Sequence, residues 1–379
     1  MAPDDENVFI LGLAEGILTK TKGITKYLQD HDIAAPTFSC SSARVPVTDD
    51  YHELQMSLKE SLEDLQLLVE GPAKFYRNYA MRGHEMAAFQ VALEFGFFTL
   101  VPSHGEISLD ELATKAGLDL DRASRILRLL ITHRFFKEAT PGFISHNSFS
   151  LALQDDEFLS LIHYSFDEML KADVESGASL KADPRQSDSL HCPFNVRHGT
   201  PIFDYYSTRP MKAARFAKAM AAWRRMNFQV QDDNQEMLDV GQKLLTDDVR
   251  DRVSFVKANF FEPQRHKGAA AYMIRQCTHN WADKDVVIMF KSVVPGLEGS
   301  LPETPLLINE IVLPETGTVS RIREREMRQA DMVMLISCGA KQRTKAEFES
   351  LLKEADARYE IRKVHDSGAL GVLEVYLRR

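Results

Sequence analysis

The sequence predicts an α/β protein with a helical N-terminal half. Leucines recur at three- and four-residue steps from position 54 to 68, which places them on one face of a long helix. From residue 228 onward, short apolar segments alternate with helical patterns, as is typical of a mostly parallel, doubly wound sheet. Ligands of such sheets bind outside the carboxyl ends of the strands. Functional residues are therefore expected directly after the predicted strands.

The composition argues against several classes of protein. The 379 residues carry 46 Lys and Arg against 55 Asp and Glu, a net charge of −9, which is unfavourable for binding nucleic acid or an anionic membrane. No apolar run approaches the roughly 20 residues of a membrane span, and no basic segment of a secretory signal precedes an apolar stretch. The four cysteines form no Cys-x-x-Cys pair, so we expect neither structural zinc nor a disulfide framework. We expect a cytoplasmic protein without nucleic-acid or membrane partners.

Two helices are predicted in the N-terminal arm and directly after it. The first runs from Val8 to Leu28, and a linker rich in Ser, Thr and Pro follows at 36–50. The leucine helix starts near residue 54 and is expected to end at Gly71-Pro72. Its leucine face is either a core face or a dimer seam.

Residues 84–153 predict a winged helix. Ser108 and Glu111 have the spacing of a capping box, and Gly117 has the position of a C-cap glycine for the same short helix. Asp119 or Asp121 then begins the second helix. Segments 135–138 and 143–145 flank Pro141-Gly142 and are expected to form a two-stranded wing.

DNA binding is one function of winged helices, and packing or dimerisation is another. The arginines in and after the second helix have a spacing suited to a groove-binding helix. They are Arg122, Arg125, Arg128 and Arg134. The acidic chain lacks the clustered basic patch that phosphate contacts need, so a packing or dimerisation domain is favoured.

The C-terminal half alternates strands and helices. Strands are predicted at 228–231, 253–256, 270–274, 306–312, 359–365 and 371–377, and helices at 234–245, 282–294, 321–336 and 345–355. Thr344 and Glu347 form a capping box at the start of the last helix. The last two strands are joined by a short turn and are expected to form an antiparallel edge.

Four segments resemble the plant and fungal small-molecule O-methyltransferases of the caffeate O-methyltransferase type, which use S-adenosyl-L-methionine. They are Phe260-Phe261-Glu262-Pro263, the stretch from Ile274 to Asp283, the stretch from Ile308 to Glu315, and Asp331 to Leu335 followed by Lys341 to Thr344. The resemblance extends from about residue 54 to the C-terminus. It implies a winged-helix dimerisation domain, a Rossmann-like methyltransferase domain, and an aromatic or polyketide-type small-molecule substrate of secondary metabolism.

The resemblance divides the chain into four parts. They are an N-terminal arm and linker (1–50), a helical and winged-helix dimerisation domain (51–155), a helical linker that lines the substrate pocket (156–227) and the Rossmann-like methyltransferase domain (228–379). Leucine stripes in both N-terminal helices, together with the resemblance, lead us to expect a homodimer.

His279 matches the general base of the family, which removes the proton of the acceptor hydroxyl before methyl transfer. An imidazole suits this role because it titrates near neutral pH. Glu310 matches the carboxylate that orients this base. Two other acidic positions of the family pattern are neutral here, since Gln342 replaces a glutamate and Asn280 replaces an aspartate. We expect both changes to make His279 a weaker base.

The cofactor site departs from the family pattern. The family carries a strand, a glycine-rich DxGxGxG loop and a helix whose N-terminus faces the cofactor. That unit belongs between Trp223-Arg224-Arg225 and Phe228, so a strand and crossover helix of about 25–30 residues are missing. Leu238-Asp239-Val240-Gly241 has the look of the loop, but no second or third glycine follows it.

The other cofactor contacts are assigned through the resemblance. Asp232 matches the acid that binds the ribose hydroxyls, Asn259 replaces the aspartate near the adenine, and Arg275 of the histidine segment is placed at the same site. No metal is expected. Three explanations of the missing unit compete: an incomplete gene model, an inactive relative, and reuse of the fold for chemistry without a methyl donor.

The third explanation has a precedent in the fungal pericyclases of the family, which guide Diels–Alder and Alder-ene cyclisations. Such reactions need a shaped apolar pocket and a few donors that polarise a carbonyl. His133, at the end of the second winged-helix helix, and Arg197, in the helical linker, are candidate donors, and Gln342 is assigned to the substrate site as well. A surface ion pair or a helix cap is an equally good role for His133 and Arg197.

Overall fold

A computed structural model of the chain describes residues 9–226, 245, 249, 251–365 and 370–379. Its internal contacts define two units, each described separately here. The first unit comprises Met1–Glu168, Arg215–Ala222 and Ser320–Ile322, and the second comprises Met169–Ala214, Trp223–Val319 and Arg323–Arg379. The strand and helix expected at 228–231 and 234–245 lie outside the described residues, apart from Leu245.

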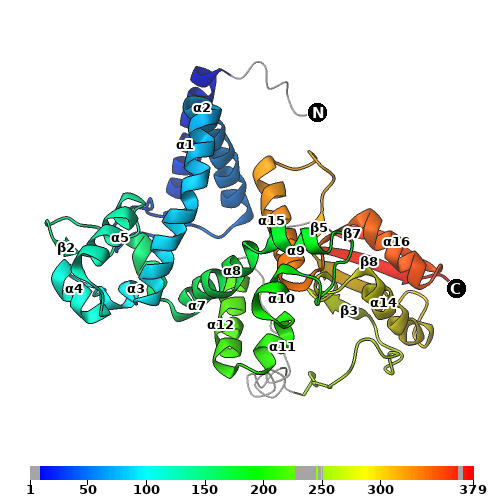
Figure 1. Ribbon diagram of the computed structural model, residues 1–379. Helices are drawn as coiled ribbons and strands as arrows, with labels where there is room; N and C mark the ends of the chain where they lie inside the picture. Colours follow the sequence, from blue (N-terminus) through cyan, green and yellow to red (C-terminus); the bar gives the residue numbers. More distant parts are fainter. Residues whose placement is uncertain (1–8, 227–244, 246–248, 250, 366–369) are drawn as a thin grey trace. The chain divides into compact units, whose positions relative to one another are not determined.

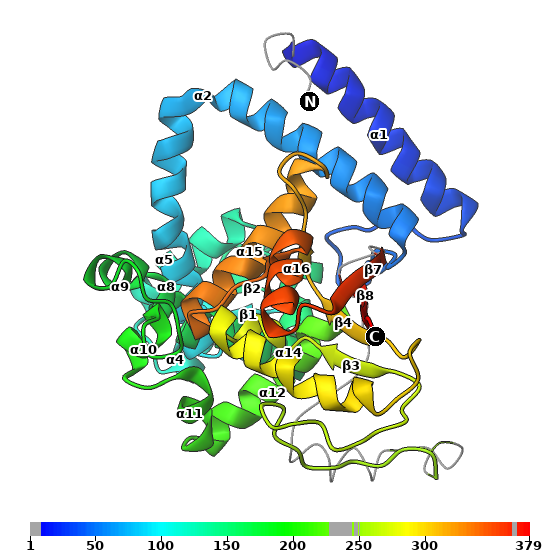
Figure 2. The ribbon, with the colours of Figure 1, turned by 90° about the vertical axis from the view of Figure 1, so that its right-hand side faces the viewer.

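The first unit begins with two long helices that lie side by side, α1 (Ile10–Asp30) and α2 (Asp49–Glu94) (Figure 1). The expectation that the leucine helix ends at Gly71-Pro72 is confirmed, because α2 joins two helical segments across a kink at this point. Gly71 leaves the helical conformation, with φ 69° and ψ 165°, and the chain kinks there and continues as a helix to Glu94 (Figure 2). Pro72 then occupies the first turn of the continuing helix, where its missing N–H group costs no hydrogen bond.

The winged-helix region follows through α3 (Phe97–Leu100), α4 (Leu109–Ala116) and α5 (Leu120–Thr132). The Ser108 hydroxyl accepts the Glu111 N–H at 3.1 Å, Gly117 ends α4 with φ 66°, and the Asp119 carboxylate caps α5 by accepting the Arg122 N–H. These predicted helix ends are confirmed.

The predicted wing is shorter than expected. Strand β2 (Phe143–Ile144) pairs with β1 (Ile107–Ser108), which directly precedes α4. The segment 135–138 contributes a single bridge, between Lys137 and Ser145. Phe136 instead turns its ring into the core, where it stacks on Phe98 with 4.8 Å between ring centroids. Burial of this aromatic side chain therefore takes precedence over strand pairing at this point.

Short helices connect the winged-helix region to the sheet. They are α6 (Ser148–Leu151), α7 (Asp156–Tyr164), α8 (Leu170–Asp173), α9 (Ser176–Ala182), α10 (Pro193–His198), α11 (Ile202–Ser207) and α12 (Pro210–Met226). In the described part of the chain, no helix combines the length and apolarity that a membrane span requires.

The second unit contains a four-stranded sheet in the order β3-β4-β8-β7. Its strands are β3 (Tyr272–Arg275), β4 (Leu306–Glu310), β7 (Tyr359–His365) and β8 (Gly371–Leu377). The β3–β4 pair is parallel, and β8 runs antiparallel to both β4 and β7. The antiparallel edge predicted from the last two strands is confirmed.

Two helices cover this sheet, α14 (Asp283–Glu298) and α16 (Lys345–Ala355), and they also contact each other. The shared core contains Phe290 and Phe348 from the helices and Ile308, Leu373 and Val375 from the sheet, all of them buried. A third helix, α15 (Arg321–Cys338), connects the two strands of a separate parallel pair, β5 (Val312–Leu313) and β6 (Arg343–Thr344). This packing fixes the carboxyl ends of β3 and β4.

The expectation of a strand at 253–256 is wrong. These residues carry no strand pairing, and Val253 and Val256 are exposed. Among the described residues, no strand pairs with the outer edge of β3, so an apolar segment at 253–256 has no described neighbour with which to form a ladder. The parallel part of the described sheet is therefore limited to β3 and β4.

Candidate active site

His279 lies on a short turn that directly follows β3. Gln276 begins the turn with φ 45° and donates its N–H to the Asn309 carbonyl at 2.9 Å, and residues Thr278–Asn280 then form one turn of 3₁₀ helix. Because Arg275 pairs with Asn309 in the parallel ladder, the turn lies beside the end of β4, where Glu310 is the last residue. The His279 Nδ1 atom is 2.6 Å from Glu310 Oε2.

Glu310 is completely buried and accepts hydrogen bonds from the whole start of the turn. Its Oε1 atom accepts the N–H groups of Cys277 and Thr278 at 2.8 and 2.7 Å and the Thr278 hydroxyl at 2.7 Å. Burial acts to raise the pKa of the Glu310 carboxyl, but the interactions with His279, Thr278 and Cys277 outweigh it and hold this pKa below its ordinary value.

The ionised carboxylate determines the tautomer of His279. A carboxylate only accepts hydrogen bonds, so the Nδ1 atom of His279 must carry the proton that lies between the two side chains. The Nε2 atom of the neutral ring is then left as a proton acceptor. The His279 side chain is 15% exposed, so a ligand can reach the ring. The Glu310 side chain is only 1% exposed and is not accessible to a ligand.

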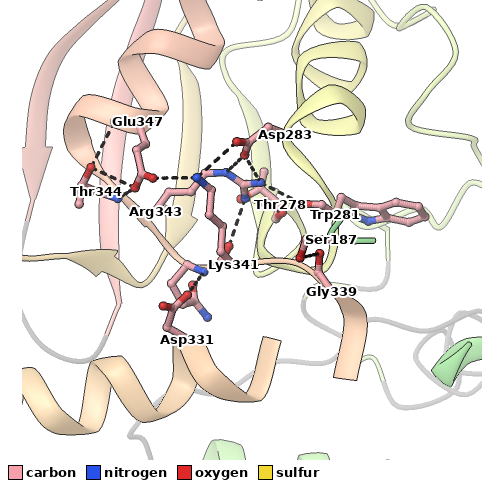
Figure 3. Close-up of polar contacts among 11 residues, drawn as sticks. Ser187, Thr278, Trp281, Asp283, Asp331, Gly339, Lys341, Arg343, Thr344 and Glu347 are labelled. Atoms are coloured by element: carbon pink, nitrogen blue, oxygen red, sulfur yellow. Dashed lines mark hydrogen bonds and ion pairs between the residues drawn. The ribbon is translucent and has the colours of Figure 1, made fainter. Parts of the chain in front are cut away.

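Arg343, whose side chain is fully buried, binds the carbonyl side of the turn. Its contacts with Thr278, Trp281 and Asp283 are shown in Figure 3. Its Nη1 atom donates to the Thr278 carbonyl at 2.9 Å and its Nη2 atom to the Trp281 carbonyl at 2.8 Å. Its Nε and Nη2 atoms also bind Asp283 Oδ1, at 3.0 and 2.8 Å. One guanidinium thus hydrogen-bonds backbone carbonyls both before and after His279.

The two neutral replacements differ in their surroundings. Gln342 is buried; its backbone N–H binds Asp331 Oδ1 at 2.8 Å, while its Oε1 atom finds no hydrogen-bond partner among the described residues. The Asn280 Oδ1 atom faces the Cys338 thiol at 4.0 Å. An unpaired buried acceptor is costly, so Gln342 Oε1 is available to a donor that a ligand brings.

The cofactor residues assigned from the sequence are only partly described. Asp232 lies outside the described residues. Asn259 accepts the Phe261 N–H at 3.1 Å and lines a cavity of about 510 Å³ beside β3, together with Phe260, Met273 and other residues of 256–274. The Nε atom of Arg275, at the end of β3, is buried without a hydrogen-bond partner among the described residues. The cavity has the size of a small-molecule site.

The two candidate polarising donors each lie beside a carboxylate. Arg197, in the last turn of α10, lies 3.5 Å from Glu175, and His133, at the end of α5, lies 3.5 Å from Glu85. His133 belongs to the first unit, whereas Arg197 belongs to the second unit with His279. Both contacts have the spacing of ion pairs, and the assignment of the two side chains as polarising donors stays a prediction.

Arg343 and Asp283 are site residues that the sequence analysis did not single out. Both lie inside segments that carry the family resemblance. The signal in the sequence was the segment Lys341 to Thr344 that carries the resemblance and contains Arg343. Its partners are backbone carbonyls more than 60 residues away in the chain, which sequence spacing does not reveal.

Comparisons with known proteins agree with this architecture. Residues 233–358 match the O-methyltransferase domain, and residues 81–153 match the O-methyltransferase dimerisation domain. O-methyltransferase sol2 of Alternaria solani is 45% identical over 97% of this chain and 95% of its own. Chlorophenol O-methyltransferase of Trichoderma longibrachiatum is 26% identical over 94% of this chain and 87% of its own.

Solved structures share the fold. OxaC superposes with a TM-score of 0.75 at 15% identity and covers 97% of this chain and 99% of its own. LepI in complex with S-adenosylmethionine superposes with a TM-score of 0.72 at 16% identity, over 97% of this chain and 100% of its own. A structure described as a pericyclic reaction enzyme gives a TM-score of 0.71 at 16% identity, over 97% and 100%.

The helical dimerisation domain and the mixed sheet together define the small-molecule methyltransferase class. The chain belongs to the O-methyltransferase family, whose enzymes use S-adenosylmethionine.

The chain is also shorter than its relative within the aligned region. The alignment with the Alternaria protein is 406 positions long but includes 97% of the 379 residues of this chain, which is about 368, so about 38 aligned positions have no counterpart here. This deficit is large enough to contain the missing strand and helix that the sequence analysis places before Phe228.

Proposed function

We propose that this chain transfers a methyl group from S-adenosylmethionine to a hydroxyl of an aromatic or polyketide-type small molecule, with His279 as the general base. The observation that carries the proposal is the 2.6 Å contact between His279 Nδ1 and the buried Glu310 carboxylate. A histidine oriented by a carboxylate through one ring nitrogen is suited to take a proton with the other.

In this mechanism the substrate hydroxyl donates a hydrogen bond to His279 Nε2. As the hydroxyl oxygen becomes nucleophilic, its proton passes to Nε2 and the imidazole becomes positively charged. The Glu310 carboxylate stabilises that charge across the Nδ1 contact without taking the proton itself. Because Glu310 is buried and already ionised, little reorganisation is needed when the imidazolium forms.

The described residues fit one part of the cofactor. The cavity beside β3 offers the Asn259 amide and apolar walls for an adenine, and the unpaired Nε of Arg275 offers a donor at the strand end. The ribose contact assigned to Asp232 lies outside the described residues. When bound, the cofactor supplies an electrophilic methyl group on a sulfonium.

Calorimetric titration with S-adenosylmethionine and S-adenosylhomocysteine tests the proposal. Micromolar binding to the 379-residue chain is the expected result, followed by methylation of phenolic acceptors in a product screen. A folded chain that binds neither compound would exclude methyl transfer, because the sulfonium is the only methyl source in the proposal.

A second candidate function is a cofactor-independent cyclisation on the same scaffold. It is favoured by the similarity of fold to a pericyclic reaction enzyme. In such a reaction bonds form and break within one substrate, so no atom is lost and no base is consumed. Loss of cyclised product in an Arg197→Ala variant, with methyl transfer absent from the wild type, would support this function over the first.

We also propose that the chain works as a homodimer in the cytoplasm. Its match to a dimerisation domain supports a dimer, as do exposed apolar side chains on α2 such as Leu62, Leu68 and Tyr76. Light scattering should then give twice the chain mass of 43.0 kDa. A monomer at micromolar concentration would overturn the dimer, and a fluorescent fusion in the host cell tests the location.

A further inference from the structure

We propose that Arg343 is a positioning residue for His279, holding the turn that carries the base through its backbone carbonyls. This inference rests on the proposed function of His279, and it concerns how the geometry of the base is maintained. It assigns a role to a buried guanidinium that neither contacts the imidazole nor belongs to the family's base pair.

The first observation is that Arg343 uses its complete set of donors. An arginine side chain carries five N–H groups. Nε donates to Asp283, the two N–H groups of Nη1 go to the Thr278 and Lys341 carbonyls, and those of Nη2 go to Trp281 and Asp283. Two of the five bonds end on the residues that lie before and after the segment 279–280. The fork geometry of a guanidinium makes this possible, and a lysine ammonium cannot reproduce it.

The second observation is that the turn is weak by itself. Within Thr278–Asn280 and its flanks, the backbone bonds are those of Asn280 N–H to the Cys277 carbonyl at 3.1 Å and of Trp281 N–H to the Thr278 carbonyl at 3.2 Å. One turn of 3₁₀ helix has poor hydrogen-bond geometry and low intrinsic stability. External partners must therefore hold it, and Glu310 binds only its N–H groups and side chains.

The third observation is that Arg343 is itself held in place by charge. Asp283, at the first position of α14, faces both Arg343 and Lys341, and Lys341 also binds Glu347 at 2.7 Å. Although partial burial acts to raise the pKa of Asp283, the bonds from Arg343 and Lys341 lower it, so this carboxyl stays ionised at neutral pH. The guanidinium is thus neutralised where it is buried, as a buried charge requires.

The experiment compares three variants by two independent measurements. Arg343→Lys keeps the positive charge but removes the forked arrangement of N–H donors. Asp283→Asn changes a half-exposed side chain and removes the negative charge that holds Arg343, while Arg343 itself is kept. Arg358→Lys is the matched control, because Arg358 also binds two carboxylates, Asp356 and Glu298, at the surface of the same unit. One measurement is the NMR signal of ring-labelled His279, assigned by its loss in His279→Ala, and its pH titration. The other is the split between kcat and KM for methyl transfer.

If Arg343 positions the base, the His279 signal and its titration shift in Arg343→Lys and, less strongly, in Asp283→Asn, while Arg358→Lys matches the wild type. We expect kcat to fall at least about tenfold in Arg343→Lys, with KM nearly unchanged, because a small displacement of a catalytic group is enough for such a loss. An unchanged His279 signal in either folded variant would overturn the proposal. A wild-type chain without methyl transfer would overturn the proposed function instead, and the NMR result would still decide the role of Arg343.

Discussion

Glu310 and Arg343 bind the same short turn through opposite kinds of group. The Glu310 carboxylate accepts the N–H groups at its start, and the Arg343 guanidinium donates to the carbonyls of Thr278 and Trp281. Both side chains are buried, and they are far apart in the sequence from the residues that they hold. The turn that carries His279 is therefore bound by a negative charge at its N–H groups and by a positive charge at its carbonyls.

Removal of the imidazole should abolish methyl transfer. His279→Ala leaves no group to take the hydroxyl proton, and we expect kcat/KM to fall by about 10²–10⁴. His365→Ala is the control, because His365 also contacts a carboxylate, Glu374, at 2.5 Å in the β7–β8 hairpin. Steady-state methylation of both variants checks the assignment. Comparable activity in His279→Ala and wild type would show that another group is the base.

Glu310 should make the stability of the protein depend on acid. Its pKa is lowered in the folded state, so the unfolded chain takes up a proton at a higher pH than the folded chain does. The stabilisation is complete above the ordinary glutamate pKa of about 4.3 and is lost as the pH falls through the lower, folded value. In Glu310→Gln this acid dependence should be weaker, and stability at pH 7 should fall by about 1–3 kcal/mol.

Urea unfolding at pH 7 and near pH 4 measures this effect. The wild type should lose more stability between the two pH values than Glu310→Gln does. If the two proteins lose equal amounts, the Glu310 carboxyl has an ordinary pKa in the folded state.

Gly339 should tolerate no side chain. It has φ 59°, and a Cβ atom there would collide with the backbone of Asp188, while Ser187 Oγ binds the Gly339 carbonyl at 2.8 Å. Gly339→Ala combines a steric clash with a left-handed backbone, so we expect a loss of about 2–4 kcal/mol. Gly317→Ala is the control for the backbone effect alone, since Gly317 has φ 76° and open space around it. It should cost about 1–2 kcal/mol.

Thermal and urea unfolding compare the two glycine variants directly. Equal losses in Gly339→Ala and Gly317→Ala would mean that the approach of Asp188 does not constrain residue 339.

The cysteines should differ sharply in reactivity. Burial raises the pKa of the Cys338 thiol to about 11 and also raises the pKa of Cys192, whereas Cys40 is exposed. Alkylation of the native protein at pH 8 should therefore modify Cys40 and spare Cys192 and Cys338, because the thiolate is the reactive form. Peptide mapping by mass spectrometry locates the modified residues. Rapid labelling of Cys338 in the folded protein would contradict its burial.

The sequence was sufficient to predict features that depend on local patterns. The caps at Ser108 and Thr344 rest on residues three positions apart, and the structure confirms them. Of the two predicted starts of the next helix, Asp119 and Asp121, the structure selects Asp119. The strands 359–365 and 371–377, predicted as a pair joined by a short turn, are confirmed as well. The geometric pairing of His279 with Glu310 follows from the resemblance together with the parallel order of their strands.

Features that depend on distant neighbours could not be predicted. The segment 253–256 has the composition of a strand, but its structure depends on a partner that the pattern does not specify. Gly71-Pro72 ends the leucine helix as predicted, but no local pattern shows that a second helical segment follows it directly. The role of Arg343 depends on carbonyl groups, which every residue carries and which no sequence pattern distinguishes.

The saturated guanidinium of Arg343 has a consequence for how substrate preference can evolve. With all five N–H groups engaged, it has none left to recognise a ligand. Discrimination among acceptors must therefore reside in other side chains, which can diverge without disturbing the proton-accepting turn. Related proteins can therefore change their small-molecule substrate while the residues that position the base stay the same.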